Sequence, residues 1–171
     1  MKYRLMGGIL YSEGNKVPVA SLKYDMFSNE KRIYDRDGKL AFTTEIVNVG
    51  SSNVKEKKYV LMNSAGVPVG TAYPGYAEGE DPDNAGWPVA WLPVTDHAKF
   101  QYKGEDFTLI RQNSQYYVLN DETQKPAVSV VHRGITGGWN LEASRKFSPE
   151  ILLAVFVFCR NIESENDLII V

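Results

Sequence analysis

The chain has 171 residues, of which 43% are hydrophobic and 23% are charged, and its net charge is −2. This composition is typical of a globular protein and is too rich in apolar residues for a disordered chain. The length fits one domain, residues 1–171, with a sizeable core, and the slight acidity argues against a protein that binds nucleic acid through overall positive charge.

The first eleven residues, Met1 to Tyr11, lack the continuous apolar stretch and the small-residue cleavage site of a secretory signal. The only cysteine, Cys159, has no partner for an internal disulfide. We therefore expect a reducing, cytoplasmic location. No transmembrane segment is expected.

Turn-forming residues recur every eight to fourteen positions and separate short segments that favour β-structure. The clearest pair is 31–34 and 40–47, which flank Asp37-Gly38, a strong hairpin signal. Many short strands at this spacing indicate a β-sandwich or a β-barrel. The expected strands are 3–6, 9–11, 17–24, 31–34, 40–47, 59–62, 67–73, 99–102, 107–111, 116–119, 127–133 and 139–143.

Two polar segments interrupt this pattern. Residues 50–58 are polar and divide the strands into an earlier and a later group, and residues 74–88 form a turn-rich loop with four acidic side chains. The first segment carries Lys55, Lys57 and Lys58, which are candidates for contact with an anionic lipid or a protein partner. The alternative is a solvated strand edge, where lysines prevent edge-to-edge aggregation.

Nine consecutive apolar residues, 151–159, predict a buried helix over residues 149–160. Ser148 can cap its first turn, Pro149 suits the first helical position, and Glu150 and Arg160 complement the helix dipole. A strand buried on both faces is the alternative. A helix of this length is too short to cross a bilayer, so we expect a core element. Beyond it, residues 168–171 could form one more short strand.

The hairpins, the Gly-Gly-Trp-Asn-Leu-Glu segment at 137–142, and Phe-Ser-Pro-Glu at 147–150 before a hydrophobic helix together resemble the tubby C-terminal-like superfamily. That group includes the LURP-one-related proteins and is similar in architecture to the phospholipid scramblases. The resemblance implies a mainly β fold: a barrel of about twelve strands that encloses one hydrophobic C-terminal helix. It also raises the possibility of phosphoinositide binding, although none of the family's basic residues can be matched to this sequence one by one.

The sequence offers little catalytic or metal-binding chemistry. The two histidines, His97 and His132, lie in different expected strands, and no Cys/His spacing suits zinc. Asp96-His97 could join a serine in a triad, but no Gly-x-Ser-x-Gly motif is present. The segment 81–86 resembles the start of a calcium loop but lacks its later ligands. We therefore assign no catalytic residue, cofactor or metal site.

These observations favour a non-catalytic binding or scaffold domain whose partner is an unknown protein or a lipid head group. Peripheral binding of phosphoinositides or other anionic lipids is one alternative, and a barrel hydrolase or transferase with dispersed catalytic residues is another. A barrel that carries a small apolar ligand ranks below both. Because the whole chain is acidic, we expect the lysines at 55, 57 and 58 to give no appreciable binding to phosphoinositide liposomes at physiological ionic strength.

Overall fold

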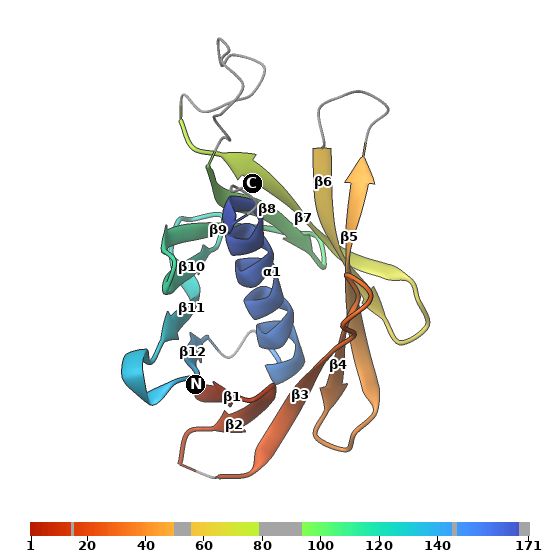
Figure 1. The fold of residues 1–171 in the computed structure, drawn as a ribbon, viewed down its shortest axis with the longest axis vertical. Coiled ribbons are helices and arrows are strands. Elements are labelled where there is room, and N and C mark those ends of the chain that lie inside the picture. Colours follow the sequence, from red (N-terminus) through yellow and green to blue (C-terminus); the bar gives the residue numbers. More distant parts are fainter. Residues whose placement is uncertain (15, 50–55, 79–93, 145–146, 168–171) are drawn as a thin grey trace.

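The computed structural model describes residues 1–14, 16–49, 56–78, 94–144 and 147–167. Twelve β-strands precede one long α-helix in this part of the chain, and a short 3-10 turn lies between the last two strands (Figure 1). The strands are β1 (Lys2–Met6), β2 (Ile9–Ser12), β3 (Pro18–Tyr24), β4 (Lys31–Asp35), β5 (Leu40–Val49), β6 (Glu56–Asn63), β7 (Pro68–Tyr76), β8 (Thr95–Tyr102), β9 (Glu105–Asn113), β10 (Tyr116–Asn120), β11 (Pro126–His132) and β12 (Trp139–Ala143); the 3-10 turn is η1 (Gly134–Thr136) and the helix is α1 (Pro149–Asp167).

The strands form a closed antiparallel barrel in which each strand pairs with the next. Strand β1 completes the ring by pairing with β12, in a register that joins Lys2 to Glu142 and Leu5 to Trp139. Because every strand then has two neighbours, the sheet has no free edge. Side chains alternate between the two faces: in β12, Leu141 is buried while Glu142 is exposed.

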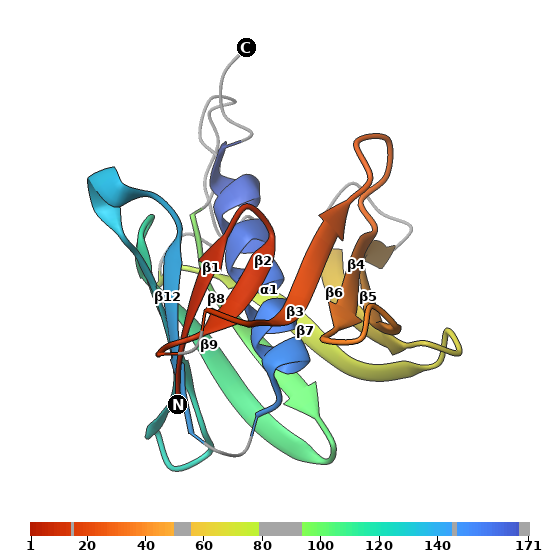
Figure 2. The same ribbon diagram turned by 90° about the horizontal axis from the view of Figure 1, so that it is seen from below.

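Helix α1 occupies the inside of this barrel (Figures 1 and 2). Residues 151–159 and Ile162 are all buried, and none is more than 4% exposed. The ring of Phe158 lies 5.8 Å from that of Tyr59 on β6 and 5.4 Å from that of Phe100 on β8. Each fully buried large apolar side chain contributes about 1.5–3 kcal/mol of transfer free energy, so the helix supplies a large share of the core.

The two ends of the barrel differ because successive hairpins turn at opposite ends. We call the end at which α1 finishes the top, and the end at which α1 begins the base. The connections β1–β2, β3–β4, β9–β10 and β11–β12 all turn at the top, since β12 runs from the top to the base before α1 returns. Figure 2 shows the β3–β4 and β11–β12 loops projecting on either side of the upper part of the helix.

The structure confirms the twelve expected strands and the enclosed helix, but several bounds differ. Strand β7 continues through Pro74 to Tyr76, so the start of the expected loop 74–88 is regular β-structure, and β8 begins at Thr95 instead of 99. Helix α1 continues to Asp167 instead of ending at Arg160, and strand β6 begins at Glu56, so part of the polar segment 50–58 is regular β-structure. The added residues of β6 and of α1 contact each other through a polar pair, Lys57 and Glu165. The tail at 168–171 and the loop residues 79–88 lie outside the described residues.

We predict that replacing Phe156 by aspartate abolishes cooperative folding. The Phe156 side chain is 4% exposed and its ring packs edge-on against Trp139, with 5.4 Å between ring centroids. A carboxylate there would be buried without a partner, which costs several kcal/mol. Thermal unfolding followed by circular dichroism should show no sharp transition. Ser164→Asp is the matched control, because Ser164 is exposed on the same helix; a Phe156→Asp protein that melts like wild type would contradict this role of the helix.

Candidate functional site

Two hollows at the base of the barrel can be compared with the size of a ligand pocket. A cavity at the base, beside the start of α1, has a volume of about 170 Å³ and is lined in part by Phe107, Phe147 and Ile151. Pockets for small molecules commonly measure about 300–1,000 Å³. A larger depression of about 460 Å³ lies over the start of β7 and the β8–β9 turn and is open to solvent. The functional chemistry of the described residues must therefore be sought on the surface and at the barrel ends.

At the top, Glu163 anchors the last turns of the helix to the barrel wall. Its carboxylate accepts hydrogen bonds from the Arg111 guanidinium, at 2.8 Å from Nε and 3.2 Å from Nη2, and from the Tyr117 hydroxyl at 2.6 Å. The hydrogen bond from Arg111 holds the pKa of Glu163 below its usual range, although burial acts in the opposite direction. Burial and the Glu163 contact raise the pKa of Tyr117. These contacts join α1 to β9 and β10.

Two further contacts hold the end of the helix to other strands. The Lys57 ammonium on β6 lies 3.0 Å from Glu165, and both side chains are mostly buried. The side-chain amide of Asn166 bridges the backbone of Thr95 on β8, accepting from its N–H and donating to its carbonyl, each at 2.9 Å. Helix residues beyond Arg160 are thus specified by polar partners, which explains why the apolar pattern alone predicted too short a helix.

The three candidate lysines are not brought together on one surface. Lys55 lies outside the described residues. Lys57 and Lys58 are successive residues of β6 and therefore point to opposite faces of the barrel wall. Lys57 shares the inward face with the buried Tyr59 and pairs with Glu165, whereas Lys58 points outward. Of the two candidate lysines that the structure describes, Lys58 alone points outward, as contact with a lipid or partner surface requires.

The Asp96–His97 pair forms, but without a serine. The Asp96 carboxylate lies 2.5 Å from His97 Nδ1. On the neighbouring strand, Gly75 lies beneath the imidazole: a Cβ atom at this glycine would be 2.3 Å from His97 Nε2. Among the described residues, no serine hydroxyl is hydrogen-bonded to His97. The structure therefore presents a histidine that packs on a glycine rather than an assembled triad.

Exposed apolar side chains at the top were not recognised from the sequence. Met26 and Phe27, in the β3–β4 loop, are 90% and 96% exposed, and Ile135, in the β11–β12 loop, is completely exposed. Isolated exposed apolar residues are common, but three at the tips of two loops on the same end are a candidate contact surface. We call Met26, Phe27 and Ile135 the apolar tips. An apolar pair inside the polar segment 25–30 was the available signal, which a search for periodicity passes over.

The described residues offer no alternative metal or thiol chemistry. Among them, no group of three or more His, Cys, Asp or Glu side chains could hold a metal ion. The possible calcium segment, 81–86, lies outside the described residues. Cys159 is completely buried, and burial raises the pKa of its thiol, which keeps it protonated. In the part of the chain that the structure describes, no helix has the length and apolar character needed to span a membrane.

Comparison of the chain with protein-family models, with curated proteins and with solved structures found no match. The resemblance to the tubby C-terminal-like superfamily therefore stays a prediction that rests on the architecture described above.

We predict that Glu163→Gln lowers the free energy of unfolding at neutral pH by about 2 kcal/mol, the usual size of a hydrogen bond to a charged group. Because the pKa of Glu163 is lower in the folded than in the unfolded state, the unfolded chain binds more protons near pH 4. The stabilisation by this carboxylate is thus present above about pH 5 and lost as the pH falls below about 4. Urea unfolding across this range should show a flatter acid decline for Glu163→Gln than for wild type.

Glu142→Gln is the control for this measurement, since Glu142 is exposed on the outer face of β12. Equal acid declines for wild type and Glu163→Gln would contradict the assigned role of Glu163.

Proposed function

We propose that this chain is a non-catalytic binding domain that presents the top of its barrel to a partner. The observation that carries the proposal is the distribution of apolar side chains. Inside, the barrel is filled by its own helix, whose residues 151–159 are buried. Outside, Met26, Phe27 and Ile135 stand in solvent on loops at the same end. A filled interior with an apolar rim suits contact with a surface more than conversion of an enclosed substrate.

The polar residues at the top support the same proposal. Glu163 is engaged by Arg111 and Tyr117, and Lys57 is engaged by Glu165. An active site instead needs titratable groups that converge on a position where a reacting atom can sit. Here the charged groups face each other and hold the helix in place.

The enzyme alternative gives a direct test. We expect purified protein to show no turnover in a broad screen of esters, phosphate esters and glycosides. His97→Ala is the variant to compare, because the Asp96–His97 pair is the most enzyme-like contact among the described residues. Turnover by wild type that is lost in His97→Ala would overturn the proposal. If turnover persists in His97→Ala, the Phe156→Asp protein, which we expect to be unfolded, identifies its source. Turnover that remains in this unfolded protein comes from a contaminant. Turnover that is lost in it comes from another site of the folded protein and would also overturn the proposal.

A lipid surface is the second candidate partner, and the side chains beside the apolar tips favour it. The β3–β4 hairpin has three cationic side chains, Lys23, Lys31 and Arg32, and two acidic ones, Asp25 and Glu30. In the β11–β12 connection, Arg133 lies two residues before Ile135. Cationic side chains attract anionic lipid head groups, while apolar side chains enter the interface beneath them. From Lys55, Lys57 and Lys58 alone we expect no appreciable binding to phosphoinositide liposomes at physiological ionic strength. The apolar tips add a contribution that salt does not screen.

We predict that the protein co-sediments with phosphatidylcholine vesicles that contain phosphatidylserine, and less with vesicles of phosphatidylcholine alone. The double variant Met26→Ser/Phe27→Ser should weaken binding by about tenfold or more, because it removes two large apolar side chains from the contact. Ile135→Ser should weaken it less.

Val67→Ser is the matched control, since Val67 is an exposed apolar residue in a turn at the base. If wild type does not co-sediment even at low salt, or if the tip variants bind as well as Val67→Ser, a lipid surface is not the partner.

A further inference from the structure

At the top rim, the short β1–β2 hairpin turns between the longer β11–β12 and β3–β4 connections. Strand β1 ends one residue after Leu5, which pairs with Trp139 at the start of β12. On the other side, the Leu22 N–H donates to the Gly8 carbonyl, and β3 continues two residues further to Tyr24. A side chain at Gly8 would meet the Leu22 carbonyl at 2.7 Å, so the turn packs closely on β3. We call this place, at Gly7 and Gly8 between Trp139 and Tyr24, the low rim.

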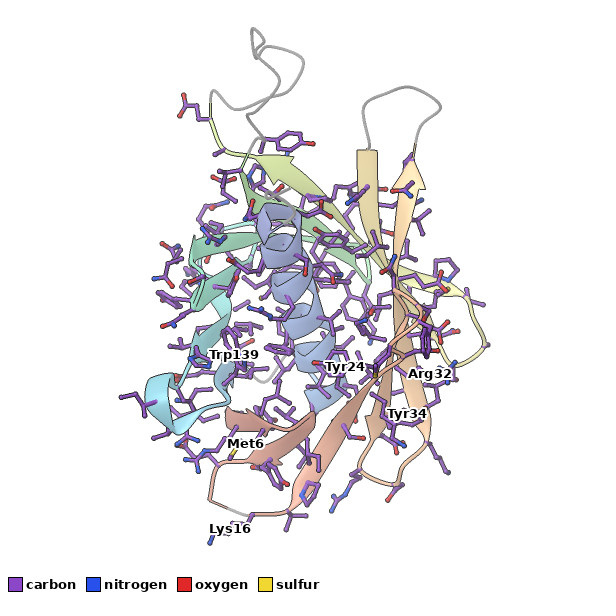
Figure 3. The ribbon with its side chains drawn as sticks, viewed as in Figure 1. Met6, Lys16, Tyr24, Arg32, Tyr34 and Trp139 are labelled. Carbon is purple, nitrogen blue, oxygen red and sulfur yellow. The ribbon has the colours of Figure 1, made fainter. Side chains whose placement is uncertain are left out.

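Helix residue Arg160 lies behind the low rim. Its guanidinium stands over the Trp139 ring, 5.5 Å from the ring centroid. On the opposite side of the helix, Tyr24 ends β3. Partial burial raises the pKa of Tyr24, and the positive charge of Arg160 acts in the opposite direction. Figure 3 shows Trp139 and Tyr24 on either side of the helix, and in Figure 2 the helix rises above the β1–β2 turn.

Arg160 has no carboxylate partner among the described residues. The nearest acid along the helix, Glu163, is already held by two hydrogen bonds from Arg111 and one from Tyr117. A partly buried guanidinium has five N–H donors, and stacking on an indole ring leaves the edges of the guanidinium open. A planar carboxylate is the group that pairs with such an edge through two parallel hydrogen bonds.

Two further donors lie against the same two aromatic rings. The Gly134 N–H donates to His132 Nδ1, which leaves His132 Nε2 as the protonated nitrogen. The His132 ring lies edge-on to Trp139, with 4.9 Å between centroids. Across the low rim, the Lys31 ammonium lies over Tyr24 at 5.4 Å and has no ion-pair partner among the described residues. The described donors at the low rim thus lie beside two aromatic side chains. The carboxylates of the adjoining elements are engaged elsewhere: Asp25 accepts from the Phe27 N–H, and Glu163 accepts from Arg111 and Tyr117.

The helix dipole helps to choose between anions. The carbonyl end of α1 lies at the top, and Glu165 adds a negative charge there. This end of a helix opposes anions, and it opposes a dianionic phosphate more than a monoanionic carboxylate. The aromatic faces of Trp139 and Tyr24 would also suit the apolar body of an organic acid better than a free, strongly hydrated inorganic ion.

We propose that the low rim binds the carboxylate of an organic acid with an apolar body, with Arg160 as its charge partner and Trp139 and Tyr24 beside its apolar part. The site uses none of the apolar tips. It can therefore exist whether or not those tips contact a lipid surface.

Octanoate, octanol and acetate test separately whether the site binds the carboxylate and whether it binds the apolar body. We expect octanoate to shift the indole N–H resonance of Trp139 in ¹⁵N-¹H spectra, with the resonance assigned through Trp139→Phe. Octanol, which lacks the charge, and acetate, which lacks the apolar body, should each bind about tenfold or more weakly than octanoate. In Arg160→Met the preference for octanoate over octanol should disappear. Arg160→Lys should keep part of it, since the charge stays but the planar edge is lost.

Arg36→Met is the matched control, because Arg36 is an exposed arginine in the β4–β5 turn at the base, far from the low rim; it should bind octanoate as wild type does. Circular dichroism melts confirm that each variant is folded. Tighter binding of inorganic phosphate than of octanoate, or the same octanoate preference in Arg160→Met as in wild type, would overturn the proposal. Met26→Ser/Phe27→Ser should retain the octanoate shift, so a failed vesicle experiment and a failed octanoate experiment are distinguishable.

Discussion

The structure depends on the need to remove an apolar helix from water on all sides. Residues 151–159 have no polar face, so a sheet that covered only one side of the helix would leave large apolar side chains exposed. A closed barrel solves this, because inward side chains such as Tyr59, Phe100 and Leu141 surround the helix from separate strands. Closure also pairs every strand edge. The helix and the barrel thus each supply what the other lacks.

This arrangement also determines where function can lie. Since the helix occupies the volume that a ligand would use in an open barrel, recognition must take place on the outside or at the ends. At the base, the described residues form a small cavity beside Phe147 and an open depression at the β8–β9 turn. The top combines loops of different height, exposed apolar side chains and a cation, Arg160, that has no acid partner among the described residues. Glu163 and Asn166 fix the rotation and depth of the helix and thereby the position of Arg160 at the rim.

The fold could be predicted well from the sequence, because it is encoded in local patterns. Alternation and turn residues indicated all twelve strands, and the apolar run indicated the helix. What failed depended on partners distant in the sequence. The last seven residues of α1 lack an apolar pattern, and their stability comes from contacts with residues such as Arg111 and Thr95. No local pattern could have revealed those contacts.

The candidate site was less predictable for the same reason. The lysines at 57 and 58 looked like one basic patch in the sequence, but the two-residue period of a strand sends them to opposite faces. Trp139 and Arg160 are twenty-one positions apart, and only the return of α1 through the barrel places one over the other. The sequence also could not show that Phe27 and Ile135 lie at the same end of the barrel, because this depends on the order in which the strands pair.

The closure of the ring by β1 and β12 has a consequence for how the protein is made. Strand β1 is made well before β12, its second partner strand, and before the helix that fills the core. Until β12 and α1 emerge from the ribosome, the nascent barrel is an incomplete sheet with an apolar inner face, and β1 has only β2 as a neighbour. Such long-range pairing folds slowly, and exposed strand edges favour association with other chains. The order of the elements therefore makes completion of the barrel depend on β12 and α1, and during translation the incomplete sheet is a natural substrate for chaperones that shield apolar surfaces.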